Sequence, residues 1–199
     1  MNSIQSPTYL RGPVALNHLL LQNFVQKGSK AIDATCGNGK DTLLLAQLVG
    51  AAGHVFAFDV QKTACLRTSE RIADAGMQKR VTIHQASHEL IADLVPSPVA
   101  AIIFNLGWLP GGDRSIITNP ETTIAALKNS LTLLQPSGLL TITCYPGHGG
   151  GDEEARQVSN WAAELAPNHW HVWRMGQMNV ATDAPSCIVV QKVNNHADA

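Results

Sequence analysis

The sequence lacks the cysteine motifs and the long apolar runs that are typical of disulfide-rich, zinc-binding and membrane proteins. Its 199 residues include four cysteines, Cys36, Cys65, Cys144 and Cys187, which are widely spaced and form no C-x-x-C pair. This spacing argues against a disulfide framework and against a zinc site, and it favours reduced thiols. No apolar run approaches the ~20 residues that span a bilayer, and the first residues carry no continuous apolar segment of the kind found in signal peptides. We therefore expect a soluble, cytoplasmic protein without a metal and without a membrane partner.

The sequence also lacks an excess of charge of one sign. It contains 14 Lys and Arg residues against 15 Asp and Glu residues, so the overall balance shows no basic excess of the kind typical of nucleic-acid binders. The distribution is uneven, since residues 1–80 hold nine basic and five acidic side chains. A basic first half is compatible with a phosphate-bearing partner, although this split is a weak signal.

The order of apolar patterns predicts the fold class. With 45% apolar residues, the chain is long enough to bury a core as one domain over 1–199, with an N-terminal extension at 1–12 and a tail at 194–199. Strand-like and helix-like segments alternate, which predicts an α/β fold whose mostly parallel sheet is covered by helices on both faces. The last two strands have no helix between them, so we expect an antiparallel hairpin at one edge. The expected strands are 30–34, 54–60, 81–86, 99–106, 139–145, 171–178 and 186–193, and the expected helices are 14–26, 40–49, 62–75, 89–94, 121–134 and 152–165.

A glycine-rich turn follows the first expected strand. In the stretch I-D-A-T-C-G-N-G-K-D-T (32–42), Gly37 and Gly39 lie between an apolar run and a helical pattern. Glycine permits positive φ and lets a ligand approach the main chain without meeting a Cβ atom. In open α/β sheets, ligands bind beyond the carboxyl ends of the strands at such turns. The turn therefore predicts a nucleotide-like cofactor, and the alternative is a tight strand-to-helix loop without a ligand.

Two acids indicate which cofactor this turn binds. Asp59 ends the second strand about 20 residues after Gly39, the spacing expected for an acid that holds a ribose. Thr42 stands where the dinucleotide fingerprint has its third glycine, which disfavours NAD. Asp33, directly before the turn, repels a pyrophosphate but attracts the sulfonium and amino groups of S-adenosylmethionine. The pattern predicts a methyltransferase, while the alternative for Asp33 is an internal cap of the turn.

The end of the fourth strand carries a second constellation, F-N-L-G-W-L-P-G-G-D (104–113). Asn105-Leu106-Gly107-Trp108 resembles the N-P-P-aromatic signature of amino-group methyltransferases, with Leu106 and Gly107 in place of the prolines. In that signature the Asn oxygen and a neighbouring carbonyl accept hydrogen bonds from the target nitrogen, and the ring packs on a planar base. The alternative is that Asn105 caps a turn and that Trp108 belongs to the core.

Other polar residues are expected on the same edge of the sheet. Tyr145 and His148 follow the fifth strand in a glycine-rich segment and are candidates for contact with the substrate, although His148 could equally be an exposed loop residue. His88 follows the third strand, where it lies near an adenine or simply caps the helix that starts at Glu89.

Together, D-A-T-C-G-N-G-K-D-T, A-F-D-V-Q, the His88-Glu89 pair and N-L-G-W-L-P-G-G-D resemble the MnmM-type tRNA methyltransferases, a family also labelled rRNA methylases. The resemblance covers most of residues 13–193. It implies the class I methyltransferase fold with strand order 3-2-1-4-5-7-6 and S-adenosyl-L-methionine as cofactor. It also implies methylation of the aminomethyl group of 5-aminomethyl-2-thiouridine at the wobble position of tRNA, with the anticodon stem-loop as partner.

The resemblance also assigns residues to roles. The methionine side of the cofactor is assigned to Asp33, Thr35, Gly37, Asn38, Gly39, Asp41 and Thr42. Its ribose and adenine side is assigned to Asp59 and Gln61, with Ser87 and His88 nearby, and the point of methyl transfer is bordered by Asn105, Gly107 and Trp108. On the substrate side we expect Arg11, Asp113, Tyr145 and His148. The charge of the basic N-terminal portion, and not the resemblance, leads us to expect Arg11 and Lys27 at anticodon-loop phosphates.

Other functions stay open from the residues alone. The same cofactor site could serve rRNA or a small-molecule amine as substrate. An NAD-dependent oxidoreductase is disfavoured by Thr42. A non-catalytic RNA-binding module gives no reason for two acids around the glycine turn, and the sequence leaves open whether the chain forms a homodimer.

Overall fold

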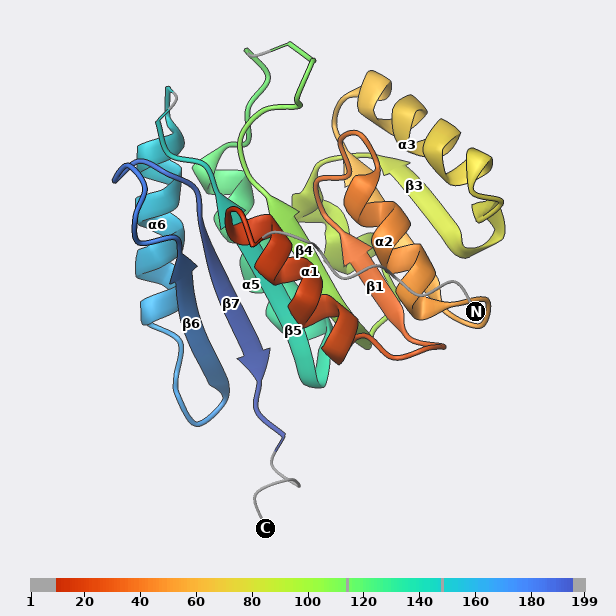
Figure 1. The fold of residues 1–199 in the computed structure, drawn as a ribbon. Helices are drawn as coiled ribbons and strands as arrows, with labels where there is room; N and C mark the ends of the chain where they lie inside the picture. The colour runs from red at the N-terminus through yellow and green to blue at the C-terminus, as the bar shows by residue number, and fades with distance from the viewer. Residues whose placement is uncertain (1–9, 114, 148, 195–199) are drawn as a thin grey trace.

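The computed structural model describes residues 10–113, 115–147 and 149–194. Its strands are β1 (Lys30–Asp33), β2 (His54–Asp59), β3 (Val81–Gln85), β4 (Val99–Asn105), β5 (Leu134–Cys144), β6 (Trp170–Gly176) and β7 (Ser186–Lys192). They form one sheet in the order β3-β2-β1-β4-β5-β7-β6 (Figure 1), which confirms the order that the resemblance implies. Strands β1 to β5 pair in parallel, whereas β7 runs antiparallel to β5 and β6. The predicted edge hairpin is therefore confirmed.

Helices cover the sheet on both faces, and each face has its own core. On one face, Leu21 of the first helix packs with Leu45 and Ile72 of the next two. On the other, Leu127 and Val158 pack against the central strands. The helices are α1 (Pro13–Phe24), α2 (Lys40–Val49), α3 (Lys62–Asp74), α4 (Ile91–Leu94), α5 (Pro120–Leu133) and α6 (Gly151–Ala163), with short 3-10 helices η1 (Gln78–Arg80) and η2 (His88–Leu90). Six of the seven residues of β4 are buried because helices lie on both of its faces.

The predicted boundaries differ from the observed ones by one or two residues in most elements, and the largest difference is at the start of the fifth strand. The fifth strand begins at Leu134 and not at residue 139, because the chain leaves α5 directly into extended structure. The first part of this strand is irregular, since its pairing with β4 shifts register between Val99 and Ala101 and Ser137 has a positive φ of 61°. Helix α6 has Gly150 as its N-cap, so Asp152 lies in the first turn.

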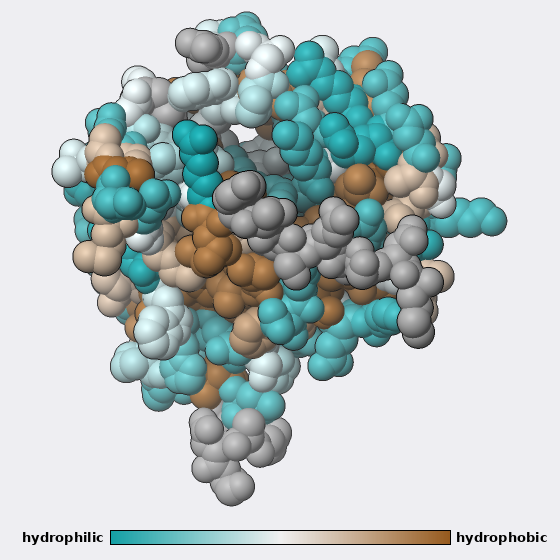
Figure 2. All heavy atoms as spheres, in the orientation of Figure 1, coloured by the Kyte–Doolittle hydropathy of each residue, from teal (hydrophilic) through white to brown (hydrophobic). Residues whose placement is uncertain are grey.

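Eight of the twelve residues of the first helix, α1, are apolar, and Figure 2 shows hydrophobic atoms gathered over it in the middle of one face. Its buried Asn17 fixes its place on the sheet. The Asn17 Nδ2 atom donates to Thr143 Oγ1 of β5 at 3.0 Å, and the Cys187 thiol of β7 donates to Asn17 Oδ1 at 2.9 Å. Since Thr143 and Cys187 face each other in the sheet, this polar anchor sets α1 across β5 and β7.

The parallel strands bring their carboxyl ends to one edge of the sheet. Asp33, Asp59 and Asn105 end β1, β2 and β4 there. Lys27, by contrast, comes just before the amino end of β1 and contacts the Gly50 region at the opposite edge. Among the residues that the structure describes, no helix is both long and apolar enough to cross a membrane.

Candidate active site

A cavity of about 870 Å³ opens at the carboxyl ends of β1, β2 and β4. Most of the predicted site residues line it, namely Thr35, Gly37, Asn38, Asp41, Asp59, Gln61, Ser87, His88, Asn105, Gly107, Trp108 and Tyr145. The predicted residues absent from its lining are Asp33, Gly39, Thr42, Arg11 and Asp113, and His148 lies outside the described residues. The structure thus brings together residues that lie far apart in the sequence.

The glycine turn has the backbone that its sequence predicts. Gly37 and Gly39 have positive φ angles of 49° and 74°. A Cβ atom on Gly39 would lie 2.9 Å from Thr68 Cα, so the turn packs directly against α3. The backbone N–H of Gly37 donates to Asp59 Oδ2 at 3.1 Å, while Gln61 N–H donates to Asp59 Oδ1 at 2.9 Å. Burial raises the pKa of Asp59, and these backbone hydrogen bonds oppose that shift.

Asp33 lies behind the turn and is fully buried. Its Oδ2 atom accepts the Thr42 hydroxyl at 2.5 Å, and its Oδ1 atom accepts the Thr35 N–H at 3.3 Å. Burial, together with the charge of Asp41, raises the pKa of Asp33 to about 7. This is the geometry of an internal cap, the alternative weighed for this residue, and contact between Asp33 and the cofactor stays a prediction.

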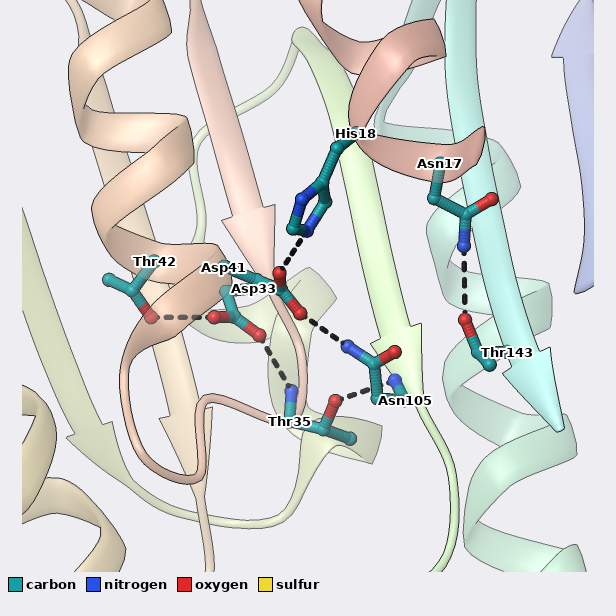
Figure 3. Close-up of polar contacts among 8 residues, drawn as sticks. All are labelled: Asn17, His18, Asp33, Thr35, Asp41, Thr42, Asn105 and Thr143. Carbon is teal, nitrogen blue, oxygen red and sulfur yellow. Dashed lines mark hydrogen bonds and ion pairs between the residues drawn. The ribbon is translucent and has the colours of Figure 1, made fainter. Parts of the chain in front are cut away.

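Asp41 is the acid of the glycine-turn segment that lines the cavity. It lies in the first turn of α2, and its carboxylate has two partners (Figure 3). Asp41 Oδ1 lies 2.6 Å from His18 Nε2, and Asp41 Oδ2 accepts the Asn105 Nδ2 amide at 2.6 Å. His18 comes from α1, so three segments far apart in sequence meet at this carboxylate.

Asn105 is held at both its backbone and its side chain. Its backbone N–H donates to Thr35 Oγ1 at 2.7 Å, which joins the end of β4 to the turn after β1. Its Nδ2 group faces Asp41, so the amide oxygen points the other way (Figure 3). This Oδ1 atom is buried and has no hydrogen-bond partner among the described residues. A buried acceptor without a partner costs free energy, and because Asn105 lines the cavity, its Oδ1 atom is a candidate acceptor for a ligand.

The loop after Asn105 is fixed from α6. The backbone N–H of Gly107 donates to Thr118 Oγ1 at 2.8 Å, and this hydroxyl donates to Glu154 Oε2 at 2.6 Å. Glu154 is only 3% exposed and accepts a second hydroxyl, that of Thr123, at 2.7 Å. Trp108 lies next to this anchor and is 36% exposed at the cavity, so it is not a core residue.

On the opposite wall of the cavity, Ser87 and His88 have different roles. Ser87, and not His88, caps η2, because its side chain accepts the Glu89 N–H. The His88 ring packs edge-on against Phe104, with centroids 5.5 Å apart, and burial lowers its pKa to about 4. His88 is therefore neutral near pH 7, and its buried Nε2 atom has no partner within the described part of the chain.

The remaining predicted residues have other surroundings. Burial and the charge of Asp41 raise the pKa of Tyr145 to about 12, so its hydroxyl keeps its proton. The Asn38 side chain turns away from the turn, donating to the Pro110 carbonyl and accepting from Arg67. Asp113 is exposed and accepts from Ser115, whose hydrogen bonds lower the pKa of Asp113.

Sequence reasoning missed His18, Thr118 and Glu154. His18 lies in an apolar helical pattern ahead of the first strand, and nothing local marks it as part of the site. Glu154 is one of three acids at the start of α6, and the pattern gives no signal that this one is buried. These contacts depend on tertiary structure alone.

The cavity fits S-adenosylmethionine better than a dinucleotide. Asp41 lines it directly after the glycine turn, and a carboxylate there disfavours the pyrophosphate that a dinucleotide places at such a turn. Asp59 also lines the cavity, and its contact with a ribose stays a prediction, while the His88 Nε2 and Asn105 Oδ1 atoms are buried without a hydrogen-bond partner among the described residues. Within the described ranges, no three His, Cys, Asp or Glu side chains come close enough to hold a metal ion.

Comparison with known proteins agrees with this site. A family model described as "Putative rRNA methylase" matches residues 55–191. The chain is 38% identical over 172 residues to the Arabidopsis thaliana protein named tRNA (mnm(5)s(2)U34)-methyltransferase, chloroplastic. That match covers 81% of this chain and 63% of the plant protein, so this chain spans less than two thirds of that relative.

Two solved structures cover 93% of this chain and 100% of their own. One is the "putative rRNA-methylase" from Clostridium thermocellum, with 37% identity and a TM-score of 0.90. The other is a "putative methyltransferase" from Streptococcus mutans in complex with SAH, with 35% identity and a TM-score of 0.84. The glycine turn, the cavity acids and the strand order agree with these matches. The chain therefore belongs to the rRNA methylase family of S-adenosylmethionine-dependent methyltransferases.

Proposed function

We propose that this chain methylates the aminomethyl group of 5-aminomethyl-2-thiouridine at the wobble position of tRNA, in the cytoplasm. The observation that carries the proposal is the buried, unpartnered Asn105 Oδ1 atom in a residue that lines the cavity. An oxygen acceptor in that place suits a substrate nitrogen that bears hydrogens. The name of the 38% identical plant relative supports the choice of this nucleoside.

The residues around the cavity have separate roles in such a reaction. Bound S-adenosylmethionine supplies an electrophilic methyl group on a sulfonium. Asn105 Oδ1 accepts an N–H of the substrate amine and so turns the nitrogen lone pair toward the methyl group. Trp108, partly exposed beside Asn105, offers a planar surface for the base. Orientation of this kind can contribute roughly 7–11 kcal/mol to lowering a barrier.

The amine must lose a proton before it attacks, because an ammonium group has no free lone pair. A strong base is unnecessary for this step, since the pKa of an alkyl amine lies only a few units above neutrality. A route to water through the open side of the cavity is sufficient. Asp41 and Tyr145 make one part of the cavity wall polar, and this favours the positive charge that the nitrogen carries directly after methylation.

A second candidate is the same chemistry on rRNA. The family description favours it, and Alkaliphilus metalliredigens has a relative named Ribosomal RNA small subunit methyltransferase H 2 that is 27% identical over 119 residues. That match covers 33% of the relative, whereas the plant tRNA enzyme matches over a larger part of both chains.

Mass spectrometry of nucleosides tests the proposal. We expect tRNA carrying 5-aminomethyl-2-thiouridine to gain one methyl group at that nucleoside after incubation with the protein and S-adenosylmethionine. Ribosomal RNA and free alkyl amines are expected to stay unmethylated in parallel reactions. Methylation of rRNA with none on the tRNA would contradict the proposal.

The Asn105→Ala variant tests the observation behind it. We expect turnover to fall by about 100-fold or more, since a lost orienting contact acts on the transition state, while the Kd for S-adenosylhomocysteine changes little. Asn160→Ala, on an exposed position of α6, is the matched control and should behave as the wild type. Equal losses of turnover and cofactor binding in Asn105→Ala would remove the orienting role.

A further inference from the structure

The three side chains His18, Asp41 and Asn105 form a continuous hydrogen-bonded chain that the family motifs do not predict. We propose that Asp41 and His18 are positioning residues for methyl transfer, acting through the amide of Asn105. In this account Asp41 holds the amide in the one orientation that presents oxygen to the substrate, and His18 holds Asp41. The inference rests on the proposed amine methylation and names the residues that make Asn105 an acceptor.

The chemistry of the amide explains why Asp41 matters. The two ends of an Asn side chain are nearly equal in shape, but one end only donates and the other only accepts. An ionised carboxylate only accepts, so the end of Asn105 that lies 2.6 Å from Asp41 Oδ2 must be the NH₂ group. The oxygen is then the end left without a partner. Rotating the amide by 180° would set oxygen against carboxylate and present a donor, which cannot orient an amine lone pair.

The position of Asp41 is itself fixed. It lies in the first turn of α2, where a negative charge is favourable, and its side chain is 14% exposed. His18 Nε2 meets its other oxygen at 2.6 Å, so neither carboxylate oxygen is free to rotate away. A hydrogen bond to a charged group is stronger than one between neutral groups, so the contact with Asp41 favours this one orientation of the Asn105 amide.

The fold provides a reason for His18 to be in this place. Its neighbour Asn17 anchors α1 on Thr143 and Cys187, and the next residue along the helix therefore faces the carboxyl edge of the sheet (Figure 3). Helix α1 precedes the first strand, yet it supplies Val14 and His18 to the cavity lining. The N-terminal helix is thus part of the active site and does more than cover the sheet.

A different role for Asp41 is direct contact with the cationic end of the cofactor, which its place on the cavity wall also permits. The two roles differ in what they affect. A cofactor ligand changes the affinity for S-adenosylmethionine, whereas a positioning residue changes the rate of transfer at unchanged affinity. The positioning role also predicts that the NMR signal of the Asn105 amide changes when Asp41 is replaced, even without substrate. Direct contact with the cofactor makes no such prediction.

The first measurement is the side-chain amide signal of Asn105 in ¹⁵N NMR spectra of the full chain, assigned through its absence in Asn105→Ala. We expect one Nδ2 proton to be shifted downfield and slow to exchange in the wild type, as for a hydrogen bond to a carboxylate. In Asp41→Ala that proton should move to the ordinary amide position. An unchanged signal in a folded Asp41→Ala variant would overturn the proposal, whatever the substrate proves to be.

The second measurement separates rate from affinity. We expect Asp41→Ala to lower the single-turnover rate by about 100-fold while the Kd values for S-adenosylmethionine and S-adenosylhomocysteine stay within about threefold. Asp41→Asn should recover most of the rate, because an amide at this place can accept from Asn105 and donate to His18. His18→Ala should lose about tenfold, and His18→Gln should regain part of it.

Asp152→Ala is the matched control, since Asp152 is an exposed acid in the first turn of another helix. A parallel loss of affinity and rate in Asp41→Ala would make Asp41 a cofactor ligand and overturn the positioning role. Should the wild type methylate rRNA and not tRNA, the proposed substrate is wrong, and the same variants are compared on the RNA that is methylated. If Asp41→Ala does not fold, His18→Ala supplies the comparison, and a rate equal to that of the wild type in this variant would overturn the proposal.

Discussion

The backbone N–H of Gly37 donates to the Asp59 carboxylate at 3.1 Å, so the acid that ends β2 holds the glycine turn that follows β1. One carboxylate thus shapes the turn and lines the cavity beside it. The ribose ligand was expected from the spacing between Gly39 and Asp59, and the structure adds a direct hydrogen bond from the other glycine of the turn, Gly37, to Asp59.

Replacement of this acid should affect the cofactor strongly. We expect Asp59→Ala to weaken binding of S-adenosylhomocysteine by about 100-fold, since hydrogen bonds to charged groups contribute roughly 1.5–3 kcal/mol. Isothermal titration calorimetry measures the effect, and Asp74→Ala, an exposed acid of α3, is the control. A Kd within threefold of the wild type in Asp59→Ala would remove Asp59 from the cofactor site.

Alanine substitutions at Gly39 and Gly76 distinguish the cost of a steric clash from the cost of backbone strain. Gly39 and Gly76 both have positive φ, 74° and 67°, but a Cβ atom meets Thr68 at 2.9 Å at the first and nothing within 4 Å at the second. We expect Gly76→Ala to cost about 1–2 kcal/mol of unfolding free energy from its left-handed backbone alone. Gly39→Ala should cost more by about 1–3 kcal/mol, as expected for overpacking. Urea unfolding compares them, and equal losses would mean that the turn moves freely away from α3.

The hydrogen bonds that hold the loop after Asn105, from Gly107 to Thr118 and from Thr118 to Glu154, lead to a third prediction. Thr118→Val removes the acceptor of the Gly107 N–H and one of the two hydroxyl donors to the buried Glu154. We expect a loss of about 2–3 kcal/mol, because buried polar groups lose their partners. Thr132→Val, an exposed position of α5, should change stability by less than about 1 kcal/mol. Thermal or urea unfolding gives both values, and similar results for the two variants would contradict the anchor.

Asp33 predicts a dependence of stability on pH. Its pKa is about 7 in the folded chain against an ordinary 3.8, so the unfolded chain releases this proton at lower pH. The contribution of this group to stability is therefore fully present below pH 3.8 and is lost as pH rises through about 7. Asp33→Asn cannot release a proton, so its stability relative to the wild type should rise over this window by roughly 1–4 kcal/mol. Urea unfolding of both proteins at pH 5 and pH 8 measures the difference, and a constant difference would place the carboxyl pKa near its ordinary value.

The parts of the structure that follow from local pattern were predictable. The helix Lys40–Val49 has the bounds that its sequence predicts, because a glycine precedes it and another follows it. The alternation of strands and helices fixes the parallel part of the sheet, and the missing helix between the last strands fixes the hairpin. Boundaries that depend on tertiary pairing differed, as at Leu134, where the chain leaves α5 directly into β5.

The site was predictable where one motif supplies neighbouring residues, as at the glycine turn and at Asn105. It was not predictable where the contact joins distant segments. His18 and Glu154 carry no local signal, since each becomes part of the site only through packing of a helix against the sheet. Lys27 was expected to face tRNA with Arg11, yet it lies at the opposite edge of the sheet from the cavity.

The polar anchor of α1, formed by Asn17, Thr143 and Cys187, has a consequence for folding during synthesis. Asn17 near the start of the chain is held by Cys187 near its end, across a separation of 170 residues. During synthesis, the complete anchor of α1 therefore forms only after β7 has been made, because Cys187 supplies one of its two hydrogen bonds. A chain clipped before β7 would keep the glycine turn and lose the Cys187 half of the anchor that seats α1 beside it.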